Sequence, residues 1–179
     1  MGSLRLVRRP RRQRLGGPAD PRLRLRVPAY GGGIAIDVET ETVITRPVAE
    51  VSAYAADPTN APAWYDNIES ATWETDPPLR VGSRVAFVAR FMGRQLTYTY
   101  EIVELVPEER LVMRTAEGPF PMETTYTWVS TAEGYTRMTL RNRGEPTGFF
   151  KLVAPIMVGA IRRANNKDLN QLKTILQGV

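Results

Sequence analysis

The stretch 96-LTYTYEIVELVPEERLVMRT-115 decides the fold class. Its first half alternates large apolar residues with polar ones, which is the pattern of a half-buried strand. A Pro-Glu-Glu turn at 107–109 interrupts the alternation, which resumes at Leu111, so the stretch predicts a β-hairpin. Strands joined by so short a connection are antiparallel. The inward side of the hairpin carries Tyr98 and Tyr100, and it either fills a core or lines a pocket.

On either side of the hairpin the sequence shows two kinds of spacing, the alternation of strands and the spacing of helices. Alternation predicts strands at 36–44, 68–75, 84–92, 94–105, 110–116, 122–129 and 135–143. Helical spacing predicts two short helices, at 47–57 and after Asn60, and a long helix at 148–176. The sheet has one apolar face and the long helix has an apolar stripe, and wrapping the sheet around the helix buries both. The predicted fold class is therefore α+β.

The composition limits the chemistry. The chain has 179 residues and contains neither cysteine nor histidine, which excludes disulfides, thiolate nucleophiles, imidazole catalysis and the usual zinc sites. The run Gly31–Gly33 precedes a strand, so it does not form a phosphate-binding loop at a helix start. We expect no metal and no cofactor, and any reaction would use carboxylates, arginine, tyrosine, hydroxyl groups or water.

Charge divides the chain into a tail and a body. Nine arginines and one aspartate give residues 1–33 a net charge of +8, and subtracting this from the chain's +5 leaves residues 34–179 at −3. We expect residues 1–33 to be a disordered tail rich in Arg, Gly and Pro, and residues 34–179 to form a single domain. The acidic body lacks the charge excess of a nucleic-acid-binding domain, so nucleic acid is not an expected partner.

The tail has two interpretations. It is either an arm for nucleic acid or acidic lipid, or upstream sequence translated from a misplaced start. We favour the second, because 21 arginines against three lysines indicate a GC-rich genome. No apolar run follows Arg8 and Arg9, and the apolar run 149–161 is shorter than the ~20 residues that span a bilayer. We therefore expect a cytoplasmic protein without a membrane span.

Several local motifs, in this order, carry a family resemblance. They are Pro47 at the first helix, 57-DPTNAPAW-64, the 99-TYEIVELVPEERL-111 hairpin, and the ending with Leu169, Leu172 and Leu176. This arrangement resembles the SRPBCC superfamily of START-related and birch-pollen-allergen-like proteins, and within it the polyketide cyclase/dehydrase group, over about residues 36–177. The resemblance implies a helix-grip fold, in which a curved antiparallel sheet of about seven strands wraps around the C-terminal helix. It also implies a cavity between the sheet and that helix.

A cavity would explain the inward tyrosines. A buried phenol needs a hydrogen-bond partner, and apolar pockets with a few convergent polar groups are typical small-molecule sites. With alternate residues taken as inward, the predicted ligand-binding residues are Trp64, Phe87, Tyr98, Tyr100, Met113, Met122, Tyr126, Trp128, Met138 and Met157. Trp64 is either a lid or a plug.

Three functions remain open at this point. The first is binding of a hydrophobic or aromatic small molecule, such as a lipid, polyketide or quinone. The second is a cofactor-free cyclase, aromatase or dehydratase, for which similarity to cyclases implies that Tyr98, Tyr100, Arg90 and Asn142 steer proton transfers. The third is a module that binds a protein segment or RNA, against which the acidic body argues. Nothing in the sequence separates the first two.

Overall fold

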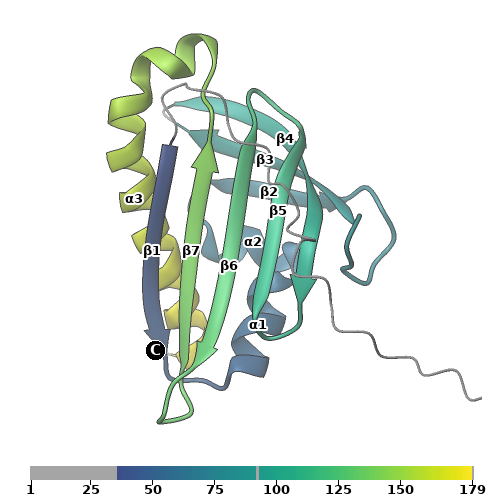
Figure 1. Ribbon diagram of the computed structural model, residues 1–179, viewed down its shortest axis with the longest axis vertical. Helices are drawn as coiled ribbons and strands as arrows, with labels where there is room; N and C mark the ends of the chain where they lie inside the picture. The colour runs from purple at the N-terminus through teal and green to yellow at the C-terminus, as the bar shows by residue number, and fades with distance from the viewer. Residues whose placement is uncertain (1–35, 92, 179) are drawn as a thin grey trace, which may run out of the picture. The chain divides into compact units, whose positions relative to one another are not determined.

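A single curled sheet forms the frame of the protein, and a long helix lies along it (Figure 1). The computed structural model describes residues 36–91 and 93–178, so the tail expected at 1–33 lies outside the described residues. The seven strands are antiparallel, in the order β1-β7-β6-β5-β4-β3-β2. Their bounds are β1 Ile36–Ile44, β2 Ile68–Trp73, β3 Arg84–Phe91, β4 Arg94–Val106, β5 Arg110–Glu117, β6 Met122–Ser130 and β7 Thr136–Gly144.

The predicted hairpin is confirmed as β4 and β5. Leu105 pairs with Leu111 across it, and Glu108 takes a positive φ of 62° in the turn. The register of this pair shifts twice, between Thr99 and Tyr100 and again between Ile102 and Glu104. Such irregularities increase the local twist of a strand pair. They accompany the curl that carries β2, β3 and β4 across the vertical strands in Figure 1.

The helices close the open side of the curl. Three short ones, α1 (Val48–Ala56), η1 (Pro58–Asn60) and α2 (Ala61–Trp64), connect β1 to β2. The long helix α3 (Gly148–Gln177) buries Leu169 and Leu172 in the main core. Pro155 lies inside α3, and Figure 1 shows the first turns of α3 at an angle to the rest, as expected where proline removes a backbone hydrogen bond.

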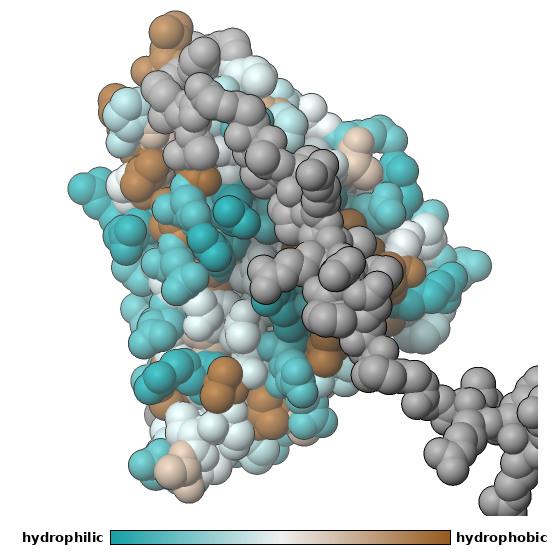
Figure 2. All heavy atoms as spheres, in the orientation of Figure 1, coloured by the Kyte–Doolittle hydropathy of each residue, from teal (hydrophilic) through white to brown (hydrophobic). Residues whose placement is uncertain are grey.

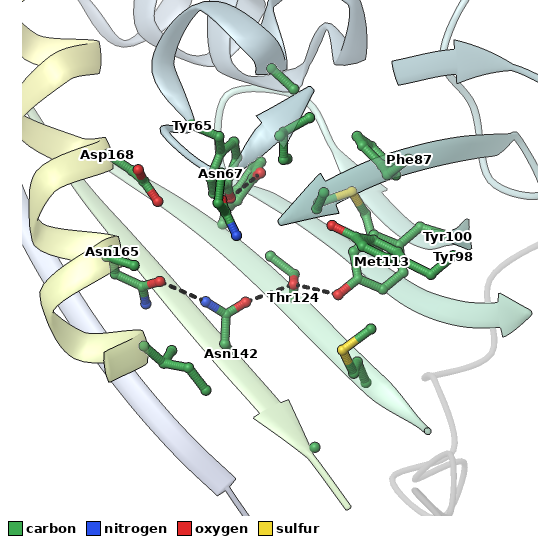
Figure 3. Close-up of a pocket in the computed structure, with 18 of the residues that line it drawn as sticks. Tyr65, Asn67, Phe87, Tyr98, Tyr100, Met113, Thr124, Asn142, Asn165 and Asp168 are labelled. Carbon is green, nitrogen blue, oxygen red and sulfur yellow. Dashed lines mark hydrogen bonds between the residues drawn. The ribbon is translucent and has the colours of Figure 1, made fainter. Parts of the chain in front are cut away.

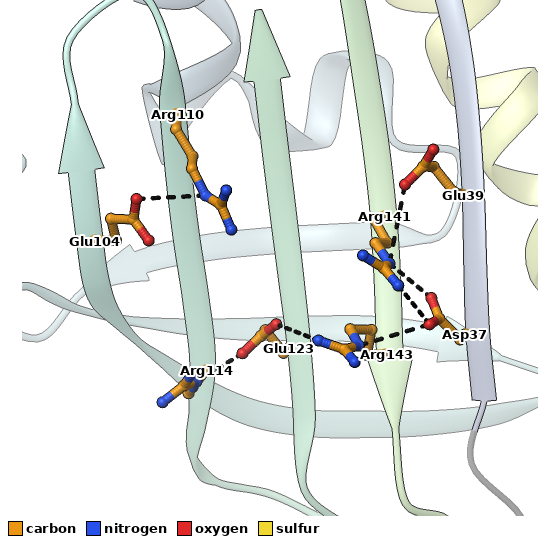
Figure 4. A network of polar contacts seen from close by, with 8 residues as sticks. All are labelled: Asp37, Glu39, Glu104, Arg110, Arg114, Glu123, Arg141 and Arg143. Carbon is orange, nitrogen blue, oxygen red and sulfur yellow. Dashed lines mark hydrogen bonds and ion pairs between the residues drawn. The ribbon is translucent and has the colours of Figure 1, made fainter. Parts of the chain in front are cut away.

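The convex face of the sheet carries a ladder of ion pairs across β5, β6, β7 and β1 (Figure 4). Glu123 lies between Arg114, at 2.7 Å, and Arg143, at 3.7 Å. Arg141 holds both carboxylate oxygens of Asp37, at 2.7 and 2.6 Å, and this bonding keeps the pKa of Asp37 below its usual range. Charged side chains thus cover the outer face while the apolar side chains point inward, as the alternation predicts.

The observed architecture confirms the α+β helix-grip prediction. In the part of the chain that the structure describes, no helix is both long and apolar enough to cross a bilayer.

Candidate functional site

A cavity of about 160 Å³ lies between the concave face of the sheet and helices α2 and α3 (Figure 3). Its apolar lining includes Phe87, Tyr98, Leu111, Met113, Phe120 and Met157. The inward side of the hairpin therefore lines a cavity instead of filling a close-packed core. Because an apolar cavity of about 150 Å³ holds benzene, the space is large enough for a small arene.

One wall of the cavity is aromatic. The rings of Phe87 and Tyr98 are stacked on neighbouring strands, with centroids 5.6 Å apart and planes 20° apart. Tyr100 meets Tyr98 edge-on, with centroids 5.1 Å apart. The sulfur-containing side chain of Met113 lies beside them in Figure 3. Flat ring faces and an adaptable thioether suit a flat, apolar ligand.

A chain of hydrogen bonds crosses the floor of the cavity from β4 to α3. The Thr124 hydroxyl donates to Asn142 Oδ1 at 2.7 Å, and Asn142 Nδ2 donates to Asn165 Oδ1 at 2.9 Å (Figure 3). A threonine hydroxyl has one hydrogen, so Tyr100, whose hydroxyl lies 3.0 Å from Thr124 Oγ1, is the donor in that bond. Burial raises the pKa of Tyr100 to about 12, which keeps it a neutral donor.

The hydrogen-bond chain ends in an unused donor. The side chain of Asn165 is buried, and its amide nitrogen has no hydrogen-bond partner among the described residues. A buried polar group without a partner is costly in free energy and calls for an explanation. An acceptor on a bound ligand would provide the missing partner.

Asp168 lies one helical turn beyond Asn165, on the same side of α3, and also lines the cavity. It is 1% exposed, and its Oδ1 accepts one hydrogen bond, from the Asp66 backbone amide at 3.0 Å. Burial raises the pKa of this carboxyl from 3.8 to about 6. Figure 3 shows the carboxyl pointing from α3 toward Tyr65. A carboxyl group with this pKa can both accept and return a proton near neutral pH.

Two further tyrosines close the cavity on the α2 side. The hydroxyls of Tyr65 and Tyr126 lie 2.7 Å apart and form a hydrogen bond. Burial holds the pKa of Tyr65 well above its usual range, so the pair stays neutral. By contrast, Tyr98 lines the cavity without a hydrogen bond to any other described residue, so its hydroxyl is free to meet a ligand.

The structure brings most of the predicted site residues together around this cavity. Those that line it are Phe87, Tyr98, Tyr100, Met113, Met122, Tyr126, Asn142 and Met157. Trp64, Trp128 and Met138 do not line it and are buried in the surrounding core, where Trp64 packs against Tyr65 with ring centroids 3.9 Å apart. Trp64 therefore occupies the position of a plug.

Arg90 lies apart from the other predicted residues. Its side chain is 71% exposed and pairs with Glu69 on the outer face of β3. Even-numbered positions of β3 point away from the cavity, while Phe87 and Ala89 point into it. The structure does not bring Arg90 to the tyrosines.

Several lining residues were not predicted from the sequence, among them Tyr65, Asn67, Thr124, Asn165 and Asp168. For Asn165 and Asp168, the sequence contains a pattern that could have identified them. Ile161, Asn165, Asp168 and Leu172 follow one another at spacings of four, three and four, so the polar pair interrupts an apolar helix stripe. Polar residues on a buried stripe are candidates for a site.

The described residues include no group of three or more acidic, histidine or cysteine side chains that could hold a metal ion. The side chains of the cavity are instead suited to apolar contact and to hydrogen bonding.

Comparison with known families gives one match. The family described as polyketide cyclase / dehydrase and lipid transport matches residues 35–177, which includes every described strand and the whole of α3. A search of curated protein sequences finds no match.

Solved structures with the same fold come from bacteria and plants. The Thermus thermophilus protein TTHA0849 is 23% identical, with a TM-score of 0.67 over 76% of this chain and 94% of its own. The ZhuI aromatase/cyclase from Streptomyces sp. R1128 is 17% identical, with a TM-score of 0.68 over 80% and 94%. Ginseng major latex-like protein 151 is 15% identical, with a TM-score of 0.54 over 75% and 99%. At these identities the likeness concerns the fold alone.

Proposed function

Because the chain belongs to the polyketide cyclase/dehydrase and lipid transport family, we propose that it binds an aromatic or otherwise hydrophobic small molecule in the cavity between the sheet and α3. The observation that carries this proposal is the pairing of an aromatic wall with a polar floor. Stacked Phe87 and Tyr98 offer a flat apolar surface, and the chain from Tyr100 to Asn165 offers directed hydrogen bonds. Apolar contact supplies affinity at such a site, and the polar groups fix orientation.

The ligand that suits this arrangement is flat and carries an oxygen at one end. An acceptor oxygen would satisfy the unused Asn165 donor, and a hydroxyl would also suit Tyr98 or Asp168. We therefore choose 2-naphthol as the probe, with 2-methylnaphthalene as its counterpart without a hydroxyl. Both are small flat arenes, and 2-naphthol is expected to bind more tightly.

Titration calorimetry with 2-naphthol tests the proposal. Ala164 lines the cavity from α3, so Ala164→Phe fills part of the space and should weaken binding at least about tenfold. The matched control is Ala49→Phe, at an exposed position of helix α1 that does not line the cavity. Unchanged binding by Ala164→Phe, or equal loss in both variants, would contradict a site in the cavity.

A second candidate, a cofactor-free cyclase or dehydratase, is favoured by Asp168. A buried carboxyl with a pKa of about 6 beside an apolar cavity has the properties of a general base for an enolisable ketone. In this mechanism Asp168 takes the proton and the Tyr98 hydroxyl donates to the carbonyl oxygen, while Tyr100 and Asn142 hold Asn165 in place through the hydrogen-bond chain. Arg90 has no part in it, because its side chain lies on the outer face.

Proton abstraction can be followed without knowing the natural substrate. We expect the protein to accelerate deuterium exchange next to the carbonyl of 2-tetralone in D₂O, with a rate that rises as Asp168 ionises near pH 6. Asp168→Asn should abolish this acceleration while 2-naphthol still binds. Exchange at the buffer rate with the native protein, at saturating 2-tetralone, would leave binding alone as the function.

A further inference from the structure

The first half of α3 has one face that lines the cavity and another that is exposed. Met157 and Ile161 point inward and line the cavity. Leu152 and Ile156, which lie four residues apart and so share a face, are 82% and 66% exposed. Figure 2 shows hydrophobic residues gathered over this part of α3. Two large aliphatic side chains held in water beside a ligand cavity suggest contact with something apolar.

Positive charge follows this apolar face along the helix. Arg163 lies seven residues after Ile156, hence on the same face, and Arg162 lies beside it. Both arginines are exposed, and neither makes an ion pair with another described residue. Leu152, Ile156, Arg162 and Arg163 together are called the outer stripe of α3 below. These two positive charges contrast with the net charge of −3 on residues 34–179.

The chain that leads into β1 is also rich in positive charge. Residues 1–33 contain nine arginines and precede β1 by only two residues. The first residue of β1, Ile36, packs in one cluster with Met157, which is the neighbour of Ile156 in α3. Ile36, which follows this arginine-rich sequence after two residues, therefore packs next to the turn of α3 that carries the outer stripe.

We propose that the outer stripe of α3 binds the surface of a bilayer that contains anionic lipids. Exposed aliphatic side chains with Arg163 on their face and Arg162 flanking it suit such a surface. The aliphatic groups enter the acyl boundary of the bilayer, and the arginines meet the lipid phosphates. This goes beyond ligand binding in the cavity. The proposed membrane surface also lies close to the cavity, since Met157 and Ile161 line the cavity from the opposite face of the same two turns of α3.

A second copy of the chain fits this surface less well. Stable dimers bury about 800 Å² per partner, and two aliphatic side chains with a basic flank fall far short of that area. If the two helices ran parallel, the arginines would also lie against their own copies, where like charges repel.

Flotation of the full chain with vesicles tests the proposal. We compare vesicles of phosphatidylcholine with vesicles that contain about 30 mol% phosphatidylglycerol, and expect binding to the anionic ones that weakens as salt rises. The double variant Leu152→Ser/Ile156→Ser should reduce partitioning at least about tenfold. Arg162→Ala/Arg163→Ala should reduce it on anionic vesicles only.

The matched control is Arg80→Ala/Val81→Ser, which alters an exposed arginine beside a 60% exposed valine in the loop between β2 and β3, away from the outer stripe. It should leave partitioning unchanged. The affinity for 2-naphthol, measured by calorimetry, should be unchanged in all three double variants. A failure of the membrane proposal can therefore be told apart from a failure of the proposed ligand binding. Partitioning of Leu152→Ser/Ile156→Ser equal to that of the native chain would overturn the proposal and assign vesicle binding to charge alone.

Depth of insertion provides a second readout. In Leu152→Trp, brominated lipids should quench tryptophan fluorescence more strongly than in Val81→Trp. Equal quenching would overturn the proposal. So would sedimentation that shows a dimer dissociated by Leu152→Ser/Ile156→Ser without any effect on vesicles, because the occupant would then be a second copy.

Discussion

Asp168 is a buried carboxyl that makes stability depend on pH. Its pKa is raised from 3.8 to about 6 in the folded protein, so folding favours the protonated form. This contribution to stability is fully present below about pH 3.8 and is lost as the pH rises through about 6. A change of about two pKa units corresponds to about 3 kcal/mol.

Asp168→Asn tests this dependence, because asparagine cannot ionise but keeps an oxygen for the Asp66 amide. The unfolding free energy of the variant minus that of the native chain should rise by about 2–3 kcal/mol between about pH 4 and pH 7.5. Urea denaturation at each pH gives the difference. Asp76→Asn, at an exposed position between β2 and β3, serves as the control. A difference that does not change with pH would mean that Asp168 stays ionised in the folded protein.

Tyr98 and Tyr100 are neighbours on one wall but differ in their hydrogen bonds. The Tyr100 hydroxyl donates to Thr124, whereas the Tyr98 hydroxyl bonds to no other described residue. Tyr100→Phe should therefore lower the unfolding free energy by about 1 kcal/mol, and Tyr98→Phe should change it by less than about 0.5 kcal/mol. Thermal unfolding of both variants checks the contrast, and equal losses would mean that the Tyr100 bond does not stabilise the fold.

At the scale of elements, the ion-pair ladder ties four strands together. Only 7% of the Glu123 side chain is exposed between Arg114 and Arg143, so Glu123→Gln removes a desolvated charge and should cost about 1–2 kcal/mol. Glu104→Gln is the control, because Glu104 is 45% exposed and its pairing with Arg110 at 3.4 Å should contribute less than about 0.5 kcal/mol. Urea denaturation measures both, and equal costs would show that burial of Glu123 does not matter.

The elements themselves could be predicted because their signals are local. Alternation and turn residues place the ends of β1, β3 and β4 within about a residue of those observed. The polar floor could not be predicted in this way, because Asn142 on β7 and Asn165 on α3 meet only when the curled sheet fixes the rotation of the helix. The bond between Tyr65 and Tyr126 likewise joins residues 61 positions apart.

Arg90 shows the limit of reasoning from chemical type. An arginine beside a turn suits an anionic or carbonyl ligand, but its even-numbered place on β3 sends the side chain to the outer face with Glu69. The same alternation that correctly placed Phe87 inward places Arg90 outward.

At the scale of the whole molecule, α3 links three properties. Its C-terminal half closes the core with Leu169 and Leu172, its middle supplies Asn165 and Asp168 to the cavity, and its first half carries the outer stripe. One helix thus joins fold, ligand site and the proposed membrane surface. The central claim, however, concerns the cavity, because both proposed chemistries depend on a ligand that enters it.

Crystallography of the protein soaked with 6-bromo-2-naphthol tests that claim most directly, because the anomalous signal of bromine locates the ring. We expect one bromine peak among Phe87, Tyr98 and Met113, with the hydroxyl toward the polar floor. A cavity that stays empty at saturating probe, or a bromine bound only at the outer surface, would contradict the account.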